Sequence, residues 1–204
     1  ALVDNPRLYV ITMLNGLTLA SLYFIVASGF TLVFGLMRNV NLAHGSLYLL
    51  GGYVAYVVST HTGWWILAVA AGFAAAALAG LLIQVVILRH MQGQDLRQTM
   101  VTIGLSIVIA DVLLWIFTGQ VHQMEAPAWL QGPIRDIPLI RAYSAYRLSL
   151  LGFGIGVGVF LWWLLARTRV GTMIRAGVDD RGMLAAAGVN VNLVFAITFA
   201  LGAG

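Results

Sequence analysis

The sequence predicts an all-α membrane protein, a polytopic transmembrane helical bundle with about five complete spans and the start of a sixth. Of its 204 residues, 61% are hydrophobic and only 9% are charged, whereas soluble domains carry about 25% charged residues. Several uncharged runs also reach the roughly 20 residues that cross a bilayer. A soluble core could not bury so much apolar surface, so the composition excludes a soluble protein.

The individual spans follow from the runs that lack charged residues. In chain order, the five complete spans are expected at about residues 9–34, 40–58, 64–88, 99–118 and 147–166. A polar turn at 59–63 separates the second span from the third. A proline-containing loop at 119–146 precedes the fifth span, and Leu193 begins the sixth. Small residues spaced four apart on the third and fifth spans predict faces for close helix packing.

The stretch 35–53 combines polar side chains with four glycines inside an apolar sequence. Polar side chains at membrane depth usually face a bundle interior or a water-filled path, and glycines let a helix break where a cavity satisfies the backbone. We therefore expect a broken or re-entrant segment that borders a translocation pathway. The pathway candidates, two of them from other spans, are Asn15, Asn39, Asn41, His44, Gly45, Ser46 and Asp111.

His44 has three chemical roles to weigh: metal ligand, base and structural donor. No second histidine, cysteine or carboxylate stands at metal-ligand spacing. Ser46 lies in no nucleophile elbow and has no identifiable acid partner. We therefore expect no metal site and no catalytic residue, and both a structural and a pathway-lining role for His44 stay open. No phosphate-binding glycine loop is present either, so any nucleotide would be bound by another subunit.

Asp111 lies about midway along the fourth expected span and shares a helix face with Gly104 and Thr118. An acid inside a span is a functional hypothesis by default. Contact with a substrate ammonium, proton coupling and a polar clamp to a neighbouring helix are the three alternatives. The clamp, for which Asn15 and Asn41 are the candidate partners, is favoured because no proton relay is visible.

The charges of the chain orient the spans. All eleven basic residues are arginines, scattered without a dense tract, which disfavours nucleic acid as a partner. Seven of them fall on one side of the expected spans and four on the other, so the positive-inside rule places the larger group in the cytoplasm. The polar segment 167–192 lies on that side. Acids at its middle and Gly188 after them predict a short capped helix near 180–187.

Motifs along nearly the whole chain resemble the first of the two permease subunits of bacterial branched-chain amino acid ABC importers. They lie, in collinear order, at 15–21, 35–46, 52–55, 102–106, 167–171 and 198–202. The resemblance implies one permease domain over 1–204, the N-terminal part of a longer chain, that binds no cofactor and sits as a multi-pass subunit in the bacterial inner membrane. The implied partners are a second permease subunit, two cytoplasmic ATPases and a periplasmic substrate-binding protein.

The same resemblance implies that 167–192 is a coupling loop that seats on an ATPase. Its candidate residues are Arg175, Asp179, Asp180, Arg181, Met183 and Gly188. A permease for urea or short amides shares these motifs and is the first alternative. A self-contained secondary transporter or channel is the second, but only Asp111 could supply a coupling charge within its spans. An intramembrane enzyme lacks a catalytic constellation.

Overall fold

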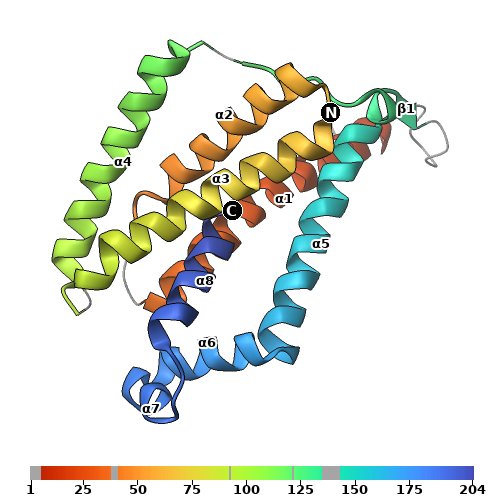
Figure 1. Ribbon diagram of the computed structural model, residues 1–204. Helices are drawn as coiled ribbons and strands as arrows, with labels where there is room; N and C mark the ends of the chain where they lie inside the picture. The colour runs from red at the N-terminus through yellow and green to blue at the C-terminus, as the bar shows by residue number, and fades with distance from the viewer. Residues whose placement is uncertain (1–5, 38–40, 92, 121, 135–142) are drawn as a thin grey trace. The chain divides into compact units, whose positions relative to one another are not determined.

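The computed structural model describes residues 6–37, 41–91, 93–120, 122–134 and 143–204. Helices dominate it (Figure 1), as the predicted all-α class requires. In chain order they are α1 (Pro6–Met37), α2 (His44–Thr62), α3 (Trp65–Val86), α4 (Asp95–Phe117), α5 (Ala145–Arg167), α6 (Arg169–Asp179), α7 (Arg181–Ala186) and α8 (Val191–Ala203). The minor elements are two 3-10 turns, η1 (Leu88–Met91) and η2 (Ala128–Leu130), and two short antiparallel strands, β1 (Pro133–Ile134) and β2 (Tyr143–Ser144).

The chain divides into two compact units. The first comprises residues 1–27 and 125–162, and the second comprises 28–124 and 163–204. Helices α1 and α5 therefore contribute residues to both units.

Four helices are long and apolar enough to cross a membrane, namely α1, α3, α4 and α5. Helix α2 has 19 residues and is about 28 Å long, close to the roughly 30 Å hydrocarbon core, but it is more polar. Its end corrects the predicted boundary: the helix continues through the expected turn at 59–63. The hydroxyls of Thr60 and Thr62 donate to carbonyls within the helix, and Gly63, in the left-handed region at φ 68°, ends it.

The second unit is built on close helix packing around α3. Helices α2 and α3 lie side by side (Figure 1), where Gly51 and Gly72 face one another so tightly that a Cβ on Gly72 would stand 2.6 Å from the Gly51 carbonyl oxygen. Further along α3, Gly80 lies against Ala203 of α8. The small-residue face predicted on the third span is thereby confirmed. The larger side chains of this core are Val33, Leu47, Ile83, Phe195 and Phe199.

The first unit joins the N-terminal part of α1 to α5. Gly154 lies against Ser21, and Gly158 lies against the ring of Phe24. The other two glycines of the alternating set on α5 are Gly152 and Gly156, and neither has a neighbour within 4 Å of a built Cβ. One glycine pair therefore packs, and the other faces away from α1.

Candidate functional site

The expected break in the stretch 35–53 is shorter than predicted. Helix α1 runs through Gly35 to Met37, and α2 runs from His44 through Gly45 and the later glycines without interruption. A break does fall within the predicted stretch, because the described residues 41–43, which precede α2, are not helical, whereas residues 44–53 continue as an uninterrupted helix. Arg38 and Asn39 lie outside the described residues. The helix continues through these glycines because glycine lowers the stability of a helix without causing a steric clash in it.

Asn41, His44 and Ser46 are all buried at the beginning of α2. The Asn41 Oδ1 accepts a hydrogen bond from the Ala43 backbone N–H at 3.1 Å, which fixes the turn into the helix. Within the described chain, the Asn41 Nδ2 is buried without a hydrogen-bond partner. Gly45, by contrast, is exposed, and nothing lies within 4 Å of a Cβ built on it. The predicted pathway residues of this stretch thus point to two sides of α2.

Helix α4 holds the beginning of α2 through two hydroxyl groups that the sequence analysis did not select as site residues. The Ser46 and Ser106 hydroxyl oxygens lie 2.7 Å apart, and the Ser46 hydroxyl also donates to the Ser106 carbonyl at 3.0 Å. The Thr102 hydroxyl accepts from the Leu42 backbone N–H at 3.3 Å. With Gln98, these residues form a polar row at four-residue spacing, and that periodicity is the signal that could have predicted them.

His44 packs against α1. Its ring lies 5.9 Å from the ring of Phe30, centroid to centroid, and its Cε1 would stand 3.3 Å from a Cβ built on Gly29. Among the described residues, no three His, Cys, Asp or Glu side chains come together in a way that could hold a metal ion. His44 therefore stands among helix-packing residues, and its role in a pathway stays a prediction.

Asn15 lies in the first unit, where its contacts are to the segment that leads into α5. Its Oδ1 accepts a 2.6 Å hydrogen bond from the Arg147 guanidinium and a 3.1 Å bond from the Tyr143 hydroxyl. The Tyr143 hydroxyl also lies 3.3 Å from that of Thr18. These bonds fasten α1 to β2 and the beginning of α5. The amide is thus engaged in structural contacts.

An open groove of about 530 Å³ lies between α1 and α5 in the first unit. Its walls are almost entirely apolar, and the hydroxyl of Ser21 donates to the Leu150 carbonyl at 3.1 Å. A polar solute would find no charged partner there. The groove is therefore a packing or lipid surface rather than a recognition site.

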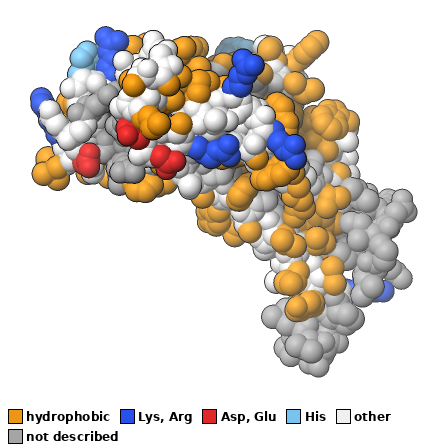
Figure 2. Space-filling model, turned by 90° about the horizontal axis from the view of Figure 1, so that it is seen from below, with side chains coloured by type: hydrophobic (Ala, Val, Ile, Leu, Met, Phe, Trp, Pro, Cys, Tyr) orange, Lys and Arg blue, Asp and Glu red, His pale blue; other side chains and the backbone are white. Residues whose placement is uncertain are grey.

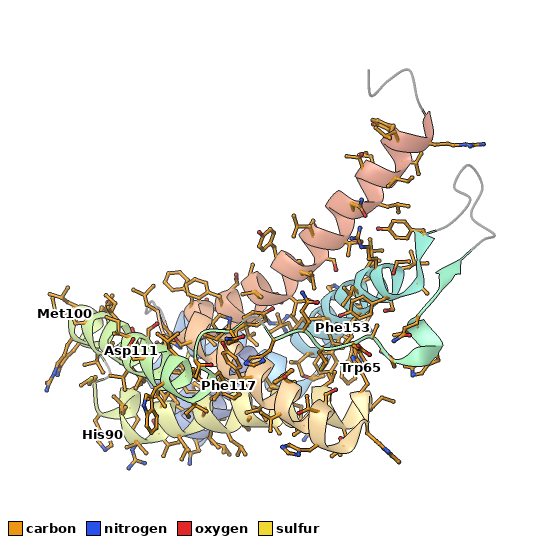
Figure 3. The ribbon with its side chains drawn as sticks, turned by 90° about the horizontal axis from the view of Figure 1, so that it is seen from above. Trp65, His90, Met100, Asp111, Phe117 and Phe153 are labelled. Carbon is orange, nitrogen blue, oxygen red and sulfur yellow. The ribbon has the colours of Figure 1, made fainter. Side chains whose placement is uncertain are left out.

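Asp111 is exposed on α4, between Met100 and Phe117 along the helix (Figure 3). In the part of the chain that the structure describes, its carboxylate makes no hydrogen bond and no ion pair. The favoured clamp to Asn41 is not found among the described residues, although the Asn41 Nδ2, which is the atom that would donate to a carboxylate, has no hydrogen-bond partner there. Asn15 lies in the first unit, so a clamp to that residue stays a prediction. Gly104 and Thr118 are exposed as well, so the three residues share an outward face, as their spacing predicts.

The polar segment 167–192 forms two short helices rather than one. Thr168 caps α6, because its hydroxyl accepts from the Gly171 backbone N–H at 3.1 Å. The buried face of α6 is made by Gly171, Ile174 and Gly177, while Arg175 and Asp179 are exposed. A Cβ on Gly171 would overlap backbone atoms of Leu165 at 2.5 Å. This close approach makes the α5–α6 corner compact.

Helix α7 matches the predicted capped helix. The Asp180 Oδ1 accepts from the Met183 backbone N–H at 3.0 Å, and Gly188 follows the helix in the left-handed region at φ 80°. Leu184 is buried, whereas Met183 is 73% exposed. Figure 2, which views the end where α6 and α7 lie, shows basic and acidic side chains gathered there. The side chain of Arg181 is outside the described atoms.

The fold and these contacts define the class of the protein. Four apolar helices of membrane length, joined by short polar segments and packed through glycines and hydroxyl groups, are those of a multi-pass helical membrane protein.

Comparison with known proteins identifies the family. Residues 12–204 match the model of the family described as branched-chain amino acid transport system, permease component, and the chain belongs to that family. The family comprises transport permeases, not enzymes. No solved structure matches the chain.

Two curated relatives illustrate the similarity. The high-affinity branched-chain amino acid transport system permease protein BraD of Pseudomonas aeruginosa is 27% identical over 96% of this chain and 67% of its own length. The corresponding protein LivH of Escherichia coli strain K12 is 30% identical over 94% of this chain and 66% of its own length. The chain thus spans about two thirds of the length of these relatives.

Proposed function

We propose that the chain is a permease subunit of an ATP-driven importer that moves branched-chain or other aliphatic amino acids across the bacterial inner membrane. The observation that carries this proposal is the family match, which continues from α1 through the polar helices α6 and α7 into α8. Two relatives are named for branched-chain amino acid transport. The chain itself performs no covalent chemistry and binds no cofactor in this proposal.

The proposed assembly contains a second permease subunit, two cytoplasmic ATPases that use ATP, and a periplasmic binding protein that delivers the amino acid. Helix α7 is the proposed contact with an ATPase. Met183 supports this role, because a large apolar side chain that is 73% exposed on a polar, extramembrane segment suits a groove on a partner. Nucleic acid has no place in the assembly.

The movement of the ATPases as they close would be transmitted to the membrane spans through packed contacts. Helix α7 packs against α6 and α8, and Leu184 is buried on that side. Helix α6 in turn meets the end of α5 at Gly171. A displacement of α7 therefore moves α5 and α8 together, since a compact corner transmits strain rather than absorbing it.

The candidate pathway begins at the polar end of α2. Asn41, His44 and Ser46 are buried against neighbouring helices, so we infer that they meet solute only when α2 moves relative to α4. That movement would separate the 2.7 Å contact between Ser46 and Ser106. Asn15, Asn39 and Gly45 are further pathway candidates that transport assays on single variants would test.

Uptake in proteoliposomes tests the function. The vesicles would contain the full-length permease, its partner permease and both ATPases, with binding protein outside and ATP inside. Leucine uptake that requires ATP is the expected result. Uptake of urea alone would assign the chain to the urea and short-amide permeases. Uptake without ATP or partner subunits would refute the importer assignment and favour a secondary transporter or channel.

Substitution of Met183 tests the coupling contact. Met183→Glu should abolish ATP-dependent uptake and ATPase binding, while membrane insertion and folding of the permease stay normal. Met183→Leu is the matched control and should retain both, because it keeps an apolar side chain of similar volume. Normal ATPase binding by the Met183→Glu variant would remove α7 from the contact.

A further inference from the structure

Asp111 is the one charged side chain that lies more than a turn from either end of the four described membrane-length helices. It precedes the last residue of α4 by six positions, so it lies about 9 Å inside the helix end. Arginine and lysine can extend a long apolar stem to the headgroups from such a depth, but aspartate cannot. Its carboxylate is therefore expected to face either a partner group or a water-filled path.

The carboxylate points away from the helices to which α4 is attached. Thr102, which bonds to Leu42, is nine residues before Asp111, and nine residues of α-helix turn through about two and a half revolutions. The two side chains thus stand on opposite sides of α4. Only 11% of the α4 span is buried, and its packing in the described chain is mainly with α2 and η1.

The outward face of α4 has the pattern of a helix-docking seam. Gly104, Val108, Asp111 and Trp115 follow one another at intervals of four, three and four residues, the spacing at which one helix packs along another. Nothing lies within 4 Å of a Cβ built on Gly104, so a second backbone can approach there. Trp115 is 84% exposed and offers a large apolar surface of the kind that dominates interfaces.

We propose that this α4 seam, defined by Gly104, Val108, Asp111 and Trp115, docks a membrane-spanning helix of a different subunit that carries a basic side chain at the depth of Asp111. The carboxylate would accept hydrogen bonds from that side chain, and the glycine would admit the backbone of the docked helix. The identification of the other subunit as the second permease rests on the proposed function.

Charge argues against two alternatives, a second copy of the chain and lipid, and the labelling experiment below separates the third, a helix of the same polypeptide beyond the residues described. A second copy of the chain in a two-fold contact would place Asp111 opposite Asp111, because such an interface joins the same patch to itself, and like charges there repel. A staggered contact between copies would need a basic residue at depth, and the arginines of the described spans stand in terminal turns. Acyl chains of lipid cannot donate a hydrogen bond to a carboxylate.

Spin labelling tests the seam directly, and residues 1–204 contain no cysteine that would compete for the label. Val108→Cys places a nitroxide on the seam, and Leu78→Cys places one on the uncharged outward face of α3 as the matched control. The two parent side chains are 57% and 59% exposed, and both lie within about 4 Å of the middle of their helices. Accessibility to oxygen reports lipid contact, and accessibility to a water-soluble nickel chelate reports an aqueous path.

In the assembled importer, the label at 108 should be several-fold less accessible to oxygen than the label at 78, and closed to the nickel chelate. In the full-length permease alone, both labels should be equally open to oxygen. Equal oxygen access in the assembled importer would show a lipid-facing surface, and nickel access at 108 would show a solute path; either result overturns the proposal. Protection at 108 in the permease alone would assign the seam to a helix of the same polypeptide and overturn it too.

Variants of Asp111 test the basic partner. Asp111→Leu should lower the recovery of the second permease with the tagged subunit several-fold, whereas Asp111→Glu should retain it. Full recovery with Asp111→Leu would overturn the assignment of a basic partner. If the importer takes up leucine but the label at residue 108 faces lipid, the proposed function is supported and only the docking proposal is refuted.

Discussion

The contact between α2 and α3 gives a prediction whose size follows from one distance. Gly72→Ala would place a Cβ 2.6 Å from the Gly51 carbonyl oxygen and 3.0 Å from the Ala55 Cβ. Because the carbonyl belongs to a helix backbone, the oxygen cannot rotate away, and the helices must separate by about 0.8 Å to reach an ordinary contact. A gap of about 0.5–1 Å forfeits a quarter to a half of the dispersion energy of the atoms concerned.

The net change in stability of the Gly72→Ala variant is the cost of overpacking minus the gain in helix propensity. Overpacking of a close contact costs about 1–3 kcal/mol, and replacement of glycine by alanine inside a helix returns about 0.8–1.0 kcal/mol. We therefore expect Gly72→Ala to lower the free energy of unfolding by up to about 2 kcal/mol. Gly52→Ala is the matched control on α2, because nothing lies within 4 Å of its built Cβ, and it should be neutral or stabilising.

The assay is thermal unfolding of the full-length permease, purified in one detergent and followed by tryptophan fluorescence, with both variants measured beside the wild type. Gly72→Ala should unfold at a lower temperature than the wild type, and Gly52→Ala should not. A Gly72→Ala variant as stable as Gly52→Ala would refute the reasoning that close backbone approach at Gly51 holds these two helices together.

Three further substitutions probe the polar end of α2 and the α7 helix. Gly188→Val should destabilise the end of α7 by about 1–2 kcal/mol, because a β-branched residue is strained at φ 80°. Uptake should fall while membrane insertion stays normal, and unchanged uptake would contradict this prediction. Asp180→Ala should remove the cap on the Met183 N–H and weaken α7 by about 1 kcal/mol, seen as faster backbone hydrogen exchange there. Ser46→Ala should cost about 0.6 kcal/mol through loss of the Ser106 contact, measured by the same unfolding assay, and no change would show that the hydroxyl pair is dispensable.

The sequence by itself determined the class of the fold. Uncharged runs of about 20 residues cannot remain in water, so the four long helices and their approximate ends follow from composition. The cap and the stop of α7 were also predictable, because Asp180 and Gly188 act on backbone groups within a few residues of themselves. The glycine and alanine face of α3 was readable from its spacing for the same local reason.

Only the tertiary structure decided which polar groups meet. Ser46 and Ser106 are sixty positions apart, and the sequence around either residue does not predict the contact with the other. The same holds for Asn15, whose partner Arg147 lies across 132 positions, and for the glycines of α5, of which one pair packs and the other does not. The sequence also could not say that Asp111 faces away from its own neighbours, because periodicity gives the angle between side chains on one helix but not the direction in which that helix is turned. Local groups fix helices, whereas the rotation of each helix is fixed by the packing of all the others.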